Sequence, residues 1–175
     1  MKYTTFDKAF KAIERIEGWF TRDEASVLYP FVRNLIVDSH MVEVGTWKGR
    51  STTFFHLINP FIKITTVDIK DRGFKHEHVE KKIMANDMYA HELIMANQKA
   101  DFVFIVCLDA CHDYEAVKED IATWEVLTRL GGHIAFHDYE PNHPEVMRAV
   151  DEWLENNQSF EVVAKANHIL IAKRI

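Results

Sequence analysis

The sequence predicts an α/β fold: two helices followed by a doubly wound, mostly parallel, Rossmann-like sheet of seven strands whose last two strands form an antiparallel hairpin. From residue 41 onward, short apolar runs alternate with helical stretches, which is the pattern of parallel strands joined by crossover helices. The 175 residues are enough for one hydrophobic core and too few for two ordinary domains. Because no linker or repeat interrupts the pattern, we expect a single domain over residues 1–175.

Two helices are expected before the first strand. Apolar residues recur at intervals of three and four from Phe6 onward, which indicates an amphipathic helix that covers something larger. A second helix is expected to start at Thr21, where Glu24 completes a capping box. Pro30 then either kinks this helix or ends its first half.

The chain is expected to divide into a helical cover at 1–38 and an α/β core at 39–175. The core strands are expected at 41–45, 62–68, 82–85, 101–108 and 132–137, the helices at about 49–58, 87–97, 113–129 and 144–156, and the closing hairpin at 160–165 and 168–173. In an open parallel sheet, ligands bind beyond the carboxyl ends of the strands, near the point where strand order reverses. The residues that end each strand are therefore the candidates for a site.

The composition limits the partners of the protein. With a net charge of −6 there is no basic field to hold a phosphate backbone, so we expect no nucleic acid and favour a small-molecule substrate. The sequence lacks the apolar run of a signal peptide, and nothing approaches the roughly 18 apolar residues of a membrane helix, so we expect no membrane partner. Cys107 and Cys111 lie in an apolar stretch, which fits reduced thiols and a cytoplasmic location.

The first core strand runs into the segment VEVGTWKGRST at 42–52, which is typical of a turn that cradles a ligand. Gly45 and Gly49 permit positive φ and close backbone approach, and Ser51 lies in the first turn of the next helix, whose free N–H groups suit a carboxylate or phosphate. The turn is neither a dinucleotide fingerprint nor a Walker loop, because Trp47 stands where a middle glycine would be. A plain strand-to-helix turn is the alternative.

Acidic residues follow the next two strands. Asp68 ends the second strand about two dozen residues after the glycine turn, where a carboxylate accepts both hydroxyls of a ribose. A solvated charge at the strand end is the alternative. Asn86 and Asp87 follow the third strand, and they either cap the next helix or accept from the exocyclic amine of an adenine.

Two polar clusters follow the fourth and fifth strands. The segment at 108–115 contains Asp109, His112 and Asp113, and the segment at 135–140 contains His137 and Asp138. If the two strands are neighbours, both clusters lie at the same rim, where carboxylates and imidazoles suit a hard metal ion or a proton-abstracting base. Alternatively, Asp113 caps a helix and the histidines are packing residues.

These motifs together resemble the class I S-adenosylmethionine-dependent methyltransferases, in the compact group related to macrocin O-methyltransferase. The resemblance runs nearly end to end. It is carried by IEGWFTRDEASVLY at 16–29, VEVGTWKGRST, VDIK, LDACHDYEAVKEDIATW at 108–124, GGHIAFHDY at 131–139 and PEVMRAVDEWL at 144–154. It implies a single methyltransferase domain with a seven-stranded, doubly wound sheet.

The resemblance also implies a cofactor site for S-adenosylmethionine. Asp68 would take the ribose hydroxyls, Asp87 would lie near the adenine, and Asp109 would face the sulfonium methyl group and the substrate. The methionine part would be held by the glycine turn, which supplies Glu43, Gly45, Thr46, Trp47, Gly49 and Ser51.

A magnesium site is a further expectation from the resemblance. Metal-dependent relatives carry an acid after strand four and an acidic or amide pair after strand five, and the corresponding residues here are Asp109, His137 and Asp138. His137 departs from that pattern, which puts the bound Mg²⁺ in question. The chain also lacks the lid or extra domain of many relatives, so a small substrate or a homodimer would complete the site.

The expected reaction is methyl transfer to a small-molecule acceptor, at a hydroxyl oxygen. Asp109 and one of His112 and His137 are the expected catalytic residues, with a histidine as the base and Asp138 orienting it or joining a metal ion. A nitrogen acceptor stays open. The rival functions are a catalytically inactive cofactor-binding or accessory protein with this fold, and an oxidoreductase, for which G-x-G-x-x-G is missing.

Overall fold

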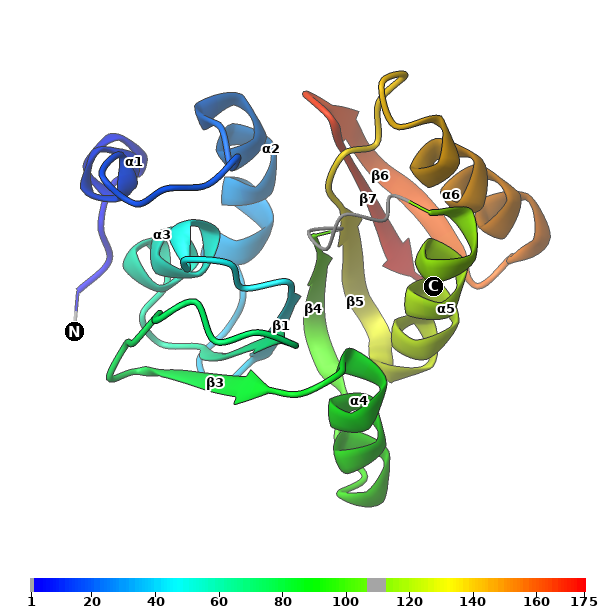
Figure 1. The fold of residues 1–175 in the computed structure, drawn as a ribbon, viewed down its shortest axis with the longest axis horizontal. Helices are drawn as coiled ribbons and strands as arrows, with labels where there is room; N and C mark the ends of the chain where they lie inside the picture. The colour runs from blue at the N-terminus through cyan, green and yellow to red at the C-terminus, as the bar shows by residue number, and fades with distance from the viewer. Residues whose placement is uncertain (1, 107–112) are drawn as a thin grey trace.

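The computed structural model describes residues 2–106 and 113–175 (Figure 1). In chain order the described elements are α1 (Phe6–Ile13), α2 (Arg22–Arg33), β1 (His40–Val44), α3 (Arg50–Ile58), β2 (Lys63–Asp68), β3 (Val79–Ile83), α4 (Asn86–Met95), β4 (Ala100–Ile105), α5 (Tyr114–Leu127), β5 (Thr128–Phe136), α6 (Pro144–Asn156), β6 (Phe160–Ala166) and β7 (Ile169–Arg174). None of the described helices is both long and apolar enough to cross a membrane.

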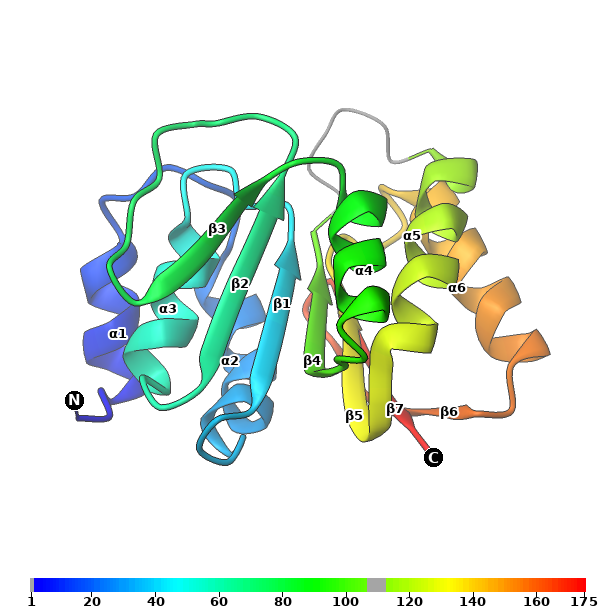
Figure 2. The same cartoon turned by 90° about the horizontal axis from the view of Figure 1, so that it is seen from below.

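The seven strands form one sheet in the order β3-β2-β1-β4-β5-β7-β6. The first five strands pair in parallel, and β7 lies antiparallel between β5 and β6. Strand order reverses between β1 and β4, and the carboxyl ends of the parallel strands share one edge of the sheet (Figure 2). The predicted fold class, with its closing hairpin, is confirmed.

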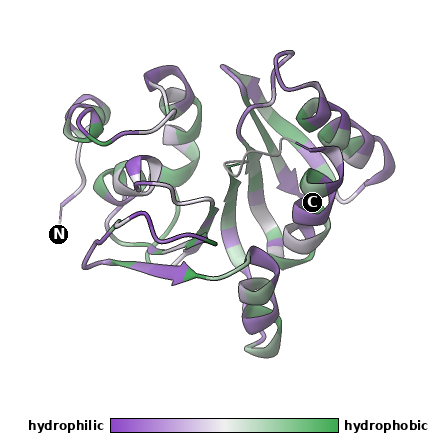
Figure 3. Cartoon of the chain, in the orientation of Figure 1, coloured by the Kyte–Doolittle hydropathy of each residue, from purple (hydrophilic) through white to green (hydrophobic). Residues whose placement is uncertain are grey.

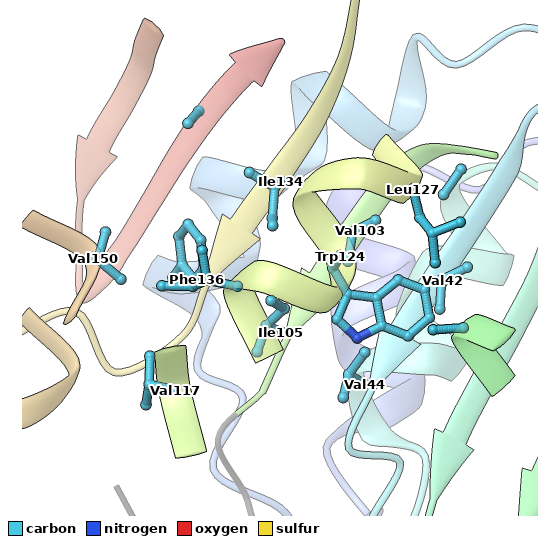
Figure 4. Close-up of a cluster of buried hydrophobic side chains, with 14 of the residues drawn as sticks. Val42, Val44, Val103, Ile105, Val117, Trp124, Leu127, Ile134, Phe136 and Val150 are labelled. Carbon is cyan, nitrogen blue, oxygen red and sulfur yellow. The ribbon is translucent and has the colours of Figure 1, made fainter. Parts of the chain in front are cut away.

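The two faces of the sheet carry separate apolar clusters. On β4, Phe102 and Phe104 pack with α1, α2 and α3, whereas Val103 and Ile105 pack with α4, α5 and α6. This division follows from the period-two alternation of side chains along a strand. Trp124 of α5 is fully buried within the second cluster, as Figure 4 shows. Both faces are covered, as doubly wound sheets require.

The two N-terminal helices cover one face. The capping box at Thr21 is present, with the Thr21 side chain and the Glu24 side chain each accepting from the other's backbone N–H. Helix α2 continues through Pro30 to Arg33, so the proline does not end it. The apolar face of α1, which includes Phe10, packs inward against α3.

Two expected boundaries were wrong. The third strand is Val79–Ile83 and not 82–85, because β3 is an edge strand that pairs only with β2 and tolerates the polar sequence VEKK, which Figure 3 shows as hydrophilic. The expectation had followed the apolar run after it. The fifth strand begins at Thr128 and not at 132, so it includes Gly131 as well as Gly132. The expected fourth strand at 101–108 extends beyond the described residues.

Candidate active site

A cavity of about 280 Å³ opens at the carboxyl edge of the sheet, at the point where strand order reverses. The strand ends and the loops after them provide one wall, and the first turns of α5 provide the other. Its lining residues are Val44, Gly45, Trp47, Val67, Asp68, Ile69, Met84, Asn86, Val106, Ala116, Val117, Glu119 and Asp120. The cavity lies where ligands bind in doubly wound sheets.

The glycine turn after β1 forms the floor of this cavity. Gly45 and Gly49 have φ values of 101° and 75°, and Trp47 between them also has a positive φ of 47°. The N–H of Gly45 donates to the carbonyl of Val67 at 2.8 Å, which holds the turn against β2. The turn is thus fixed to the neighbouring strand before any ligand binds.

Asp68 and the glycine turn are joined directly. The backbone N–H of Trp47 donates to Oδ2 of Asp68 at 2.9 Å, and the N–H of Lys70 donates to Oδ1 at 2.9 Å. Each carboxylate oxygen keeps a lone pair for another donor. Asp68 therefore presents an oriented carboxylate to the cavity, as a pair of ribose hydroxyls would need.

Glu43 lies beneath the turn and not in the cavity wall. Its fully buried carboxylate accepts hydrogen bonds from Ser51 at 2.5 Å, from Thr66 at 3.0 Å, and from Thr52. Burial raises the pKa of Glu43 to about 7, against the effect of these three hydroxyls. Glu43 thus ties β1 and β2 to the first turn of α3.

Of the two residues that the sequence offered after the third strand, Asn86 lines the cavity and Asp87 does not. Asn86 lines the cavity and donates from Nδ2 to Oδ1 of Asp120 at 2.6 Å. Burial raises the pKa of Asp120 to about 6, opposed by that hydrogen bond. Asp87 is exposed. Neither Asn86 nor Asp87 is the cap of α4, because Ala85 occupies that position.

Sequence reasoning did not single out Asp120 or Glu119. Both belong to the segment LDACHDYEAVKED that carries the family resemblance. Helix α5 places its apolar stripe on the sheet and these two acids at the cavity edge. With Asp68, the cavity has three acidic lining residues, and no basic side chain among the described residues lines it.

A second, smaller cavity of about 20 Å³ adjoins the first. Trp47 and Val106 line both cavities. The other lining residues come from the cover, the glycine turn and the ends of β4 and β5, and they are Gly18, Trp19, Phe20, Thr46, Arg50, Ser51, Phe104 and His137. Trp19 and Trp47 have ring centroids 5.4 Å apart, and Trp19 is 63% exposed. Thr46 and Ser51 therefore face this space and not the main cavity.

His137 forms the buried floor of the smaller cavity, between two carboxylates. Its Nε2 lies 3.0 Å from Oε1 of Glu24, and its Nδ1 lies 2.8 Å from Oδ2 of Asp138. The distance between Nδ1 and Oδ2 of Asp138 is that of an ion pair, but the two groups are not aligned for a hydrogen bond. Burial lowers the pKa of His137, but Asp138 and Glu24 outweigh it and raise the pKa to about 9.

Of the remaining predicted residues, the structure describes Asp113 only. Asp109 and His112 lie outside the described residues, as do Cys107 and Cys111. Asp113 is the N-cap of α5 by position, as the alternative interpretation had it, but its side chain accepts no capping hydrogen bond in the described part of the chain.

Of the three residues expected to hold magnesium, Asp109 lies outside the described residues, and His137 and Asp138 join Glu24 in a cluster that does not fit Mg²⁺. Ligand atoms of Glu24, His137 and Asp138 lie within 4.8 Å of one another, which is compact enough for an ion. However, Mg²⁺ prefers oxygen ligands, and a histidine binds metal only through a deprotonated nitrogen. With a pKa of about 9 and a carboxylate at each nitrogen, His137 is protonated at neutral pH.

Comparison with known proteins agrees with this geometry. A family model described as a methyltransferase domain matches residues 42–139, which is more than half of the chain. Among curated proteins, none matches this sequence.

Solved structures share the fold at low sequence identity. MycE methyltransferase from the mycinamycin biosynthetic pathway, in complex with Mg, SAH and mycinamycin VI, has a TM-score of 0.72 and 14% identity, over 99% of this chain and 55% of MycE. The chain thus spans about half the length of MycE. An O-methyltransferase from Bacillus cereus in complex with SAH has a TM-score of 0.67 and 14% identity, over 100% of this chain and 92% of its own.

Proposed function

Because this chain belongs to the methyltransferase domain family, we propose that it transfers a methyl group from S-adenosylmethionine to a hydroxyl oxygen of a small-molecule acceptor. The observation that carries the proposal is the cavity at the reversal of strand order, where the backbone of the glycine turn orients the carboxylate of Asp68. The solved relatives named with SAH and as O-methyltransferases support the cofactor and the acceptor atom.

The charge of the cavity favours a cationic cofactor. Asp68, Glu119 and Asp120 line it, and no described lining residue is basic. The sulfonium and ammonium groups of S-adenosylmethionine are attracted to such a lining, whereas the pyrophosphate of a dinucleotide is repelled. This distinguishes methyl transfer from the rival oxidoreductase function.

Different residues are proposed to bind different parts of the cofactor. Asp68 accepts the ribose hydroxyls, and the Asn86 and Asp120 pair lies at the end where the adenine would lie. The glycine turn, through Gly45 and Trp47, lies beneath the methionine part. Bound there, the cofactor supplies a methyl carbon that its sulfonium already activates for displacement.

The acceptor is proposed to bind at the mouth of the smaller cavity, since about 20 Å³ holds little more than a water molecule. Trp47 and Val106 are shared by both cavities, so an acceptor beside Trp19 lies next to the cofactor cavity. The exposed indole of Trp19 is then the wall that excludes water. The removal of the acceptor proton is assigned to His112, with Asp109 facing the reacting atoms, because His137 is already protonated.

Calorimetric titration with S-adenosylmethionine and SAH tests this proposal. We expect micromolar binding that Asp68→Ala abolishes and that Asp87→Ala, an exposed acid one residue from the cavity, leaves intact. NAD is the control ligand and is expected not to bind. Binding of NAD without binding of S-adenosylmethionine would refute the proposal. Methylation of a panel of small hydroxylated acceptors, followed by SAH release, then separates an enzyme from a cofactor-binding accessory protein.

A further inference from the structure

The carboxylate of Glu24 makes two different contacts. Its Oε2 accepts from the backbone N–H of Thr21 at 2.6 Å and from the Thr21 hydroxyl at 2.8 Å, which closes the capping box of α2. Its Oε1 faces Nε2 of His137 at 3.0 Å. Glu24 therefore takes part in the N-terminal capping of α2 and also contacts His137, which follows β5.

The cluster that results is isolated from solvent. The side chains of Glu24 and His137 are each 4% exposed, and that of Asp138 is 16% exposed. A buried carboxylate needs a compensating positive charge, and the ring of His137 provides it for two carboxylates at once. Glu24, His137 and Asp138 hold two negative charges around one central cation.

This arrangement has the charge pattern of a metal site without the metal. In such a site, carboxylates from strand ends surround a divalent cation beside the acceptor. Here the cation is part of the chain: each ring nitrogen of His137 lies within 3.0 Å of a carboxylate oxygen, and a ring that is protonated at both nitrogens has no lone pair for a metal ion. His137 also lines the smaller cavity, where the acceptor is proposed to bind.

We propose that the ring of His137, held by Glu24 and Asp138, takes the place of a divalent metal ion beside the acceptor cavity, and that Glu24 is the residue that positions it. The inference that the site works on the acceptor rests on the proposed function. The inference that it excludes Mg²⁺ does not, since it concerns only the described side chains. The cover is then part of the site, because α2 supplies Glu24.

Direct binding of Mn²⁺, followed by electron paramagnetic resonance, tests the exclusion of metal. All proteins carry His143→Ala, which dismantles the neighbouring group of Asp138, Glu140 and His143 as an alternative site. We expect no saturable Mn²⁺ binding with His137 present. We expect His137→Asp, which makes the set all-oxygen, to gain stoichiometric binding. Stoichiometric binding with His137 present, or a folded His137→Asp protein that binds none, would overturn the proposal.

The positioning role of Glu24 has a separate spectroscopic test. With ¹⁵N-labelled histidine we expect a solvent-protected proton signal from each ring nitrogen of His137 at neutral pH. Glu24→Gln keeps a side-chain acceptor for the capping box but removes the charge, and it is expected to lose the Nε2 proton signal. Thr21→Ala removes the cap alone and is expected to keep both signals. Loss in Thr21→Ala, or retention in Glu24→Gln, contradicts the role.

These measurements need no acceptor and no bound cofactor. If S-adenosylmethionine fails to bind while Mn²⁺ is excluded and both ring protons are present, the proposed function is wrong and the cluster stands. If S-adenosylmethionine binds but Mn²⁺ also binds at Asp138 through His137, the proposed function stands and this inference is wrong.

Discussion

The ring of Phe74 lies directly against Gly49: a Cβ atom built on Gly49 would come within 2.1 Å of Cδ2 of Phe74. Phe74 belongs to the crossover between β2 and β3, and Gly49 is the N-cap of α3. The glycine turn that floors the cavity is therefore held from two sides, by β2 and by this ring.

Gly49→Ala is expected to destabilise the protein by about 2–4 kcal/mol, from positive-φ strain plus overlap with Phe74. Gly73→Ala is the matched control, because its φ of 82° gives similar strain while nothing lies within 4 Å of its Cβ. Its expected cost is about 1 kcal/mol. Urea unfolding measures both. If the two variants lose equal stability, the contact with Phe74 is unimportant.

Glu43 is expected to make stability depend on pH. Its folded pKa of about 7 lies above the ordinary 4.5, so its contribution is fully present below about 4.5 and is lost as the pH rises through 7. The loss is on the order of 3 kcal/mol. Glu43→Gln should remove this slope. Parallel pH profiles of unfolding free energy for the two proteins would contradict the assignment.

Asp120 is expected to make cofactor affinity depend on pH. Since its pKa is about 6, acidification below 6 neutralises it and should weaken binding of S-adenosylmethionine. At neutral pH we expect Asp120→Asn to weaken binding about tenfold, or about 1.4 kcal/mol, and to flatten the profile. Calorimetry at several pH values measures this, with Asp87→Asn as the control. An unchanged affinity in Asp120→Asn would place the adenine elsewhere.

The ion pairs of His137 predict a second loss of stability, at more alkaline pH than the loss from Glu43. The folded pKa of about 9 lies above the ordinary 6.5, so the contribution is full below 6.5 and is lost as the pH rises through 9. Burial raises the pKa of Glu24, but His137 and Thr21 outweigh it, so the Glu24 contribution is lost only on acidification. His137→Gln should flatten the alkaline part of the profile. Thr21→Ala should lower the whole curve by about 1 kcal/mol and leave its shape intact.

The sequence predicted those parts of the site whose chemistry is local. The glycine turn and Asp68 follow their strands directly, and the structure joins them by a hydrogen bond from Trp47 to Asp68. Of Asn86 and Asp87, which the sequence offered together, Asn86 lines the cavity and Asp87 is exposed.

Other parts depended on packing that no local pattern encodes. Asp120 faces the cavity only because α5 packs its opposite stripe on the sheet. Glu24 was recognised as a cap from its spacing to Thr21, but its contact with His137 joins residues far apart in the chain. That contact depends on how α2 packs against the sheet. The hydrophobic periodicity and the helix propensity of the sequence do not specify this packing.

The position of the cover has a consequence for synthesis on the ribosome. Helices α1 and α2 precede the sheet in the chain, yet the apolar residues they pack with include Phe104 on β4 and Ala135 on β5, which are made later. Until those strands exist, Phe10 and Leu28 have no complete surface to bury them. The contact between Glu24 of α2 and His137 can therefore form only after β5 has been made.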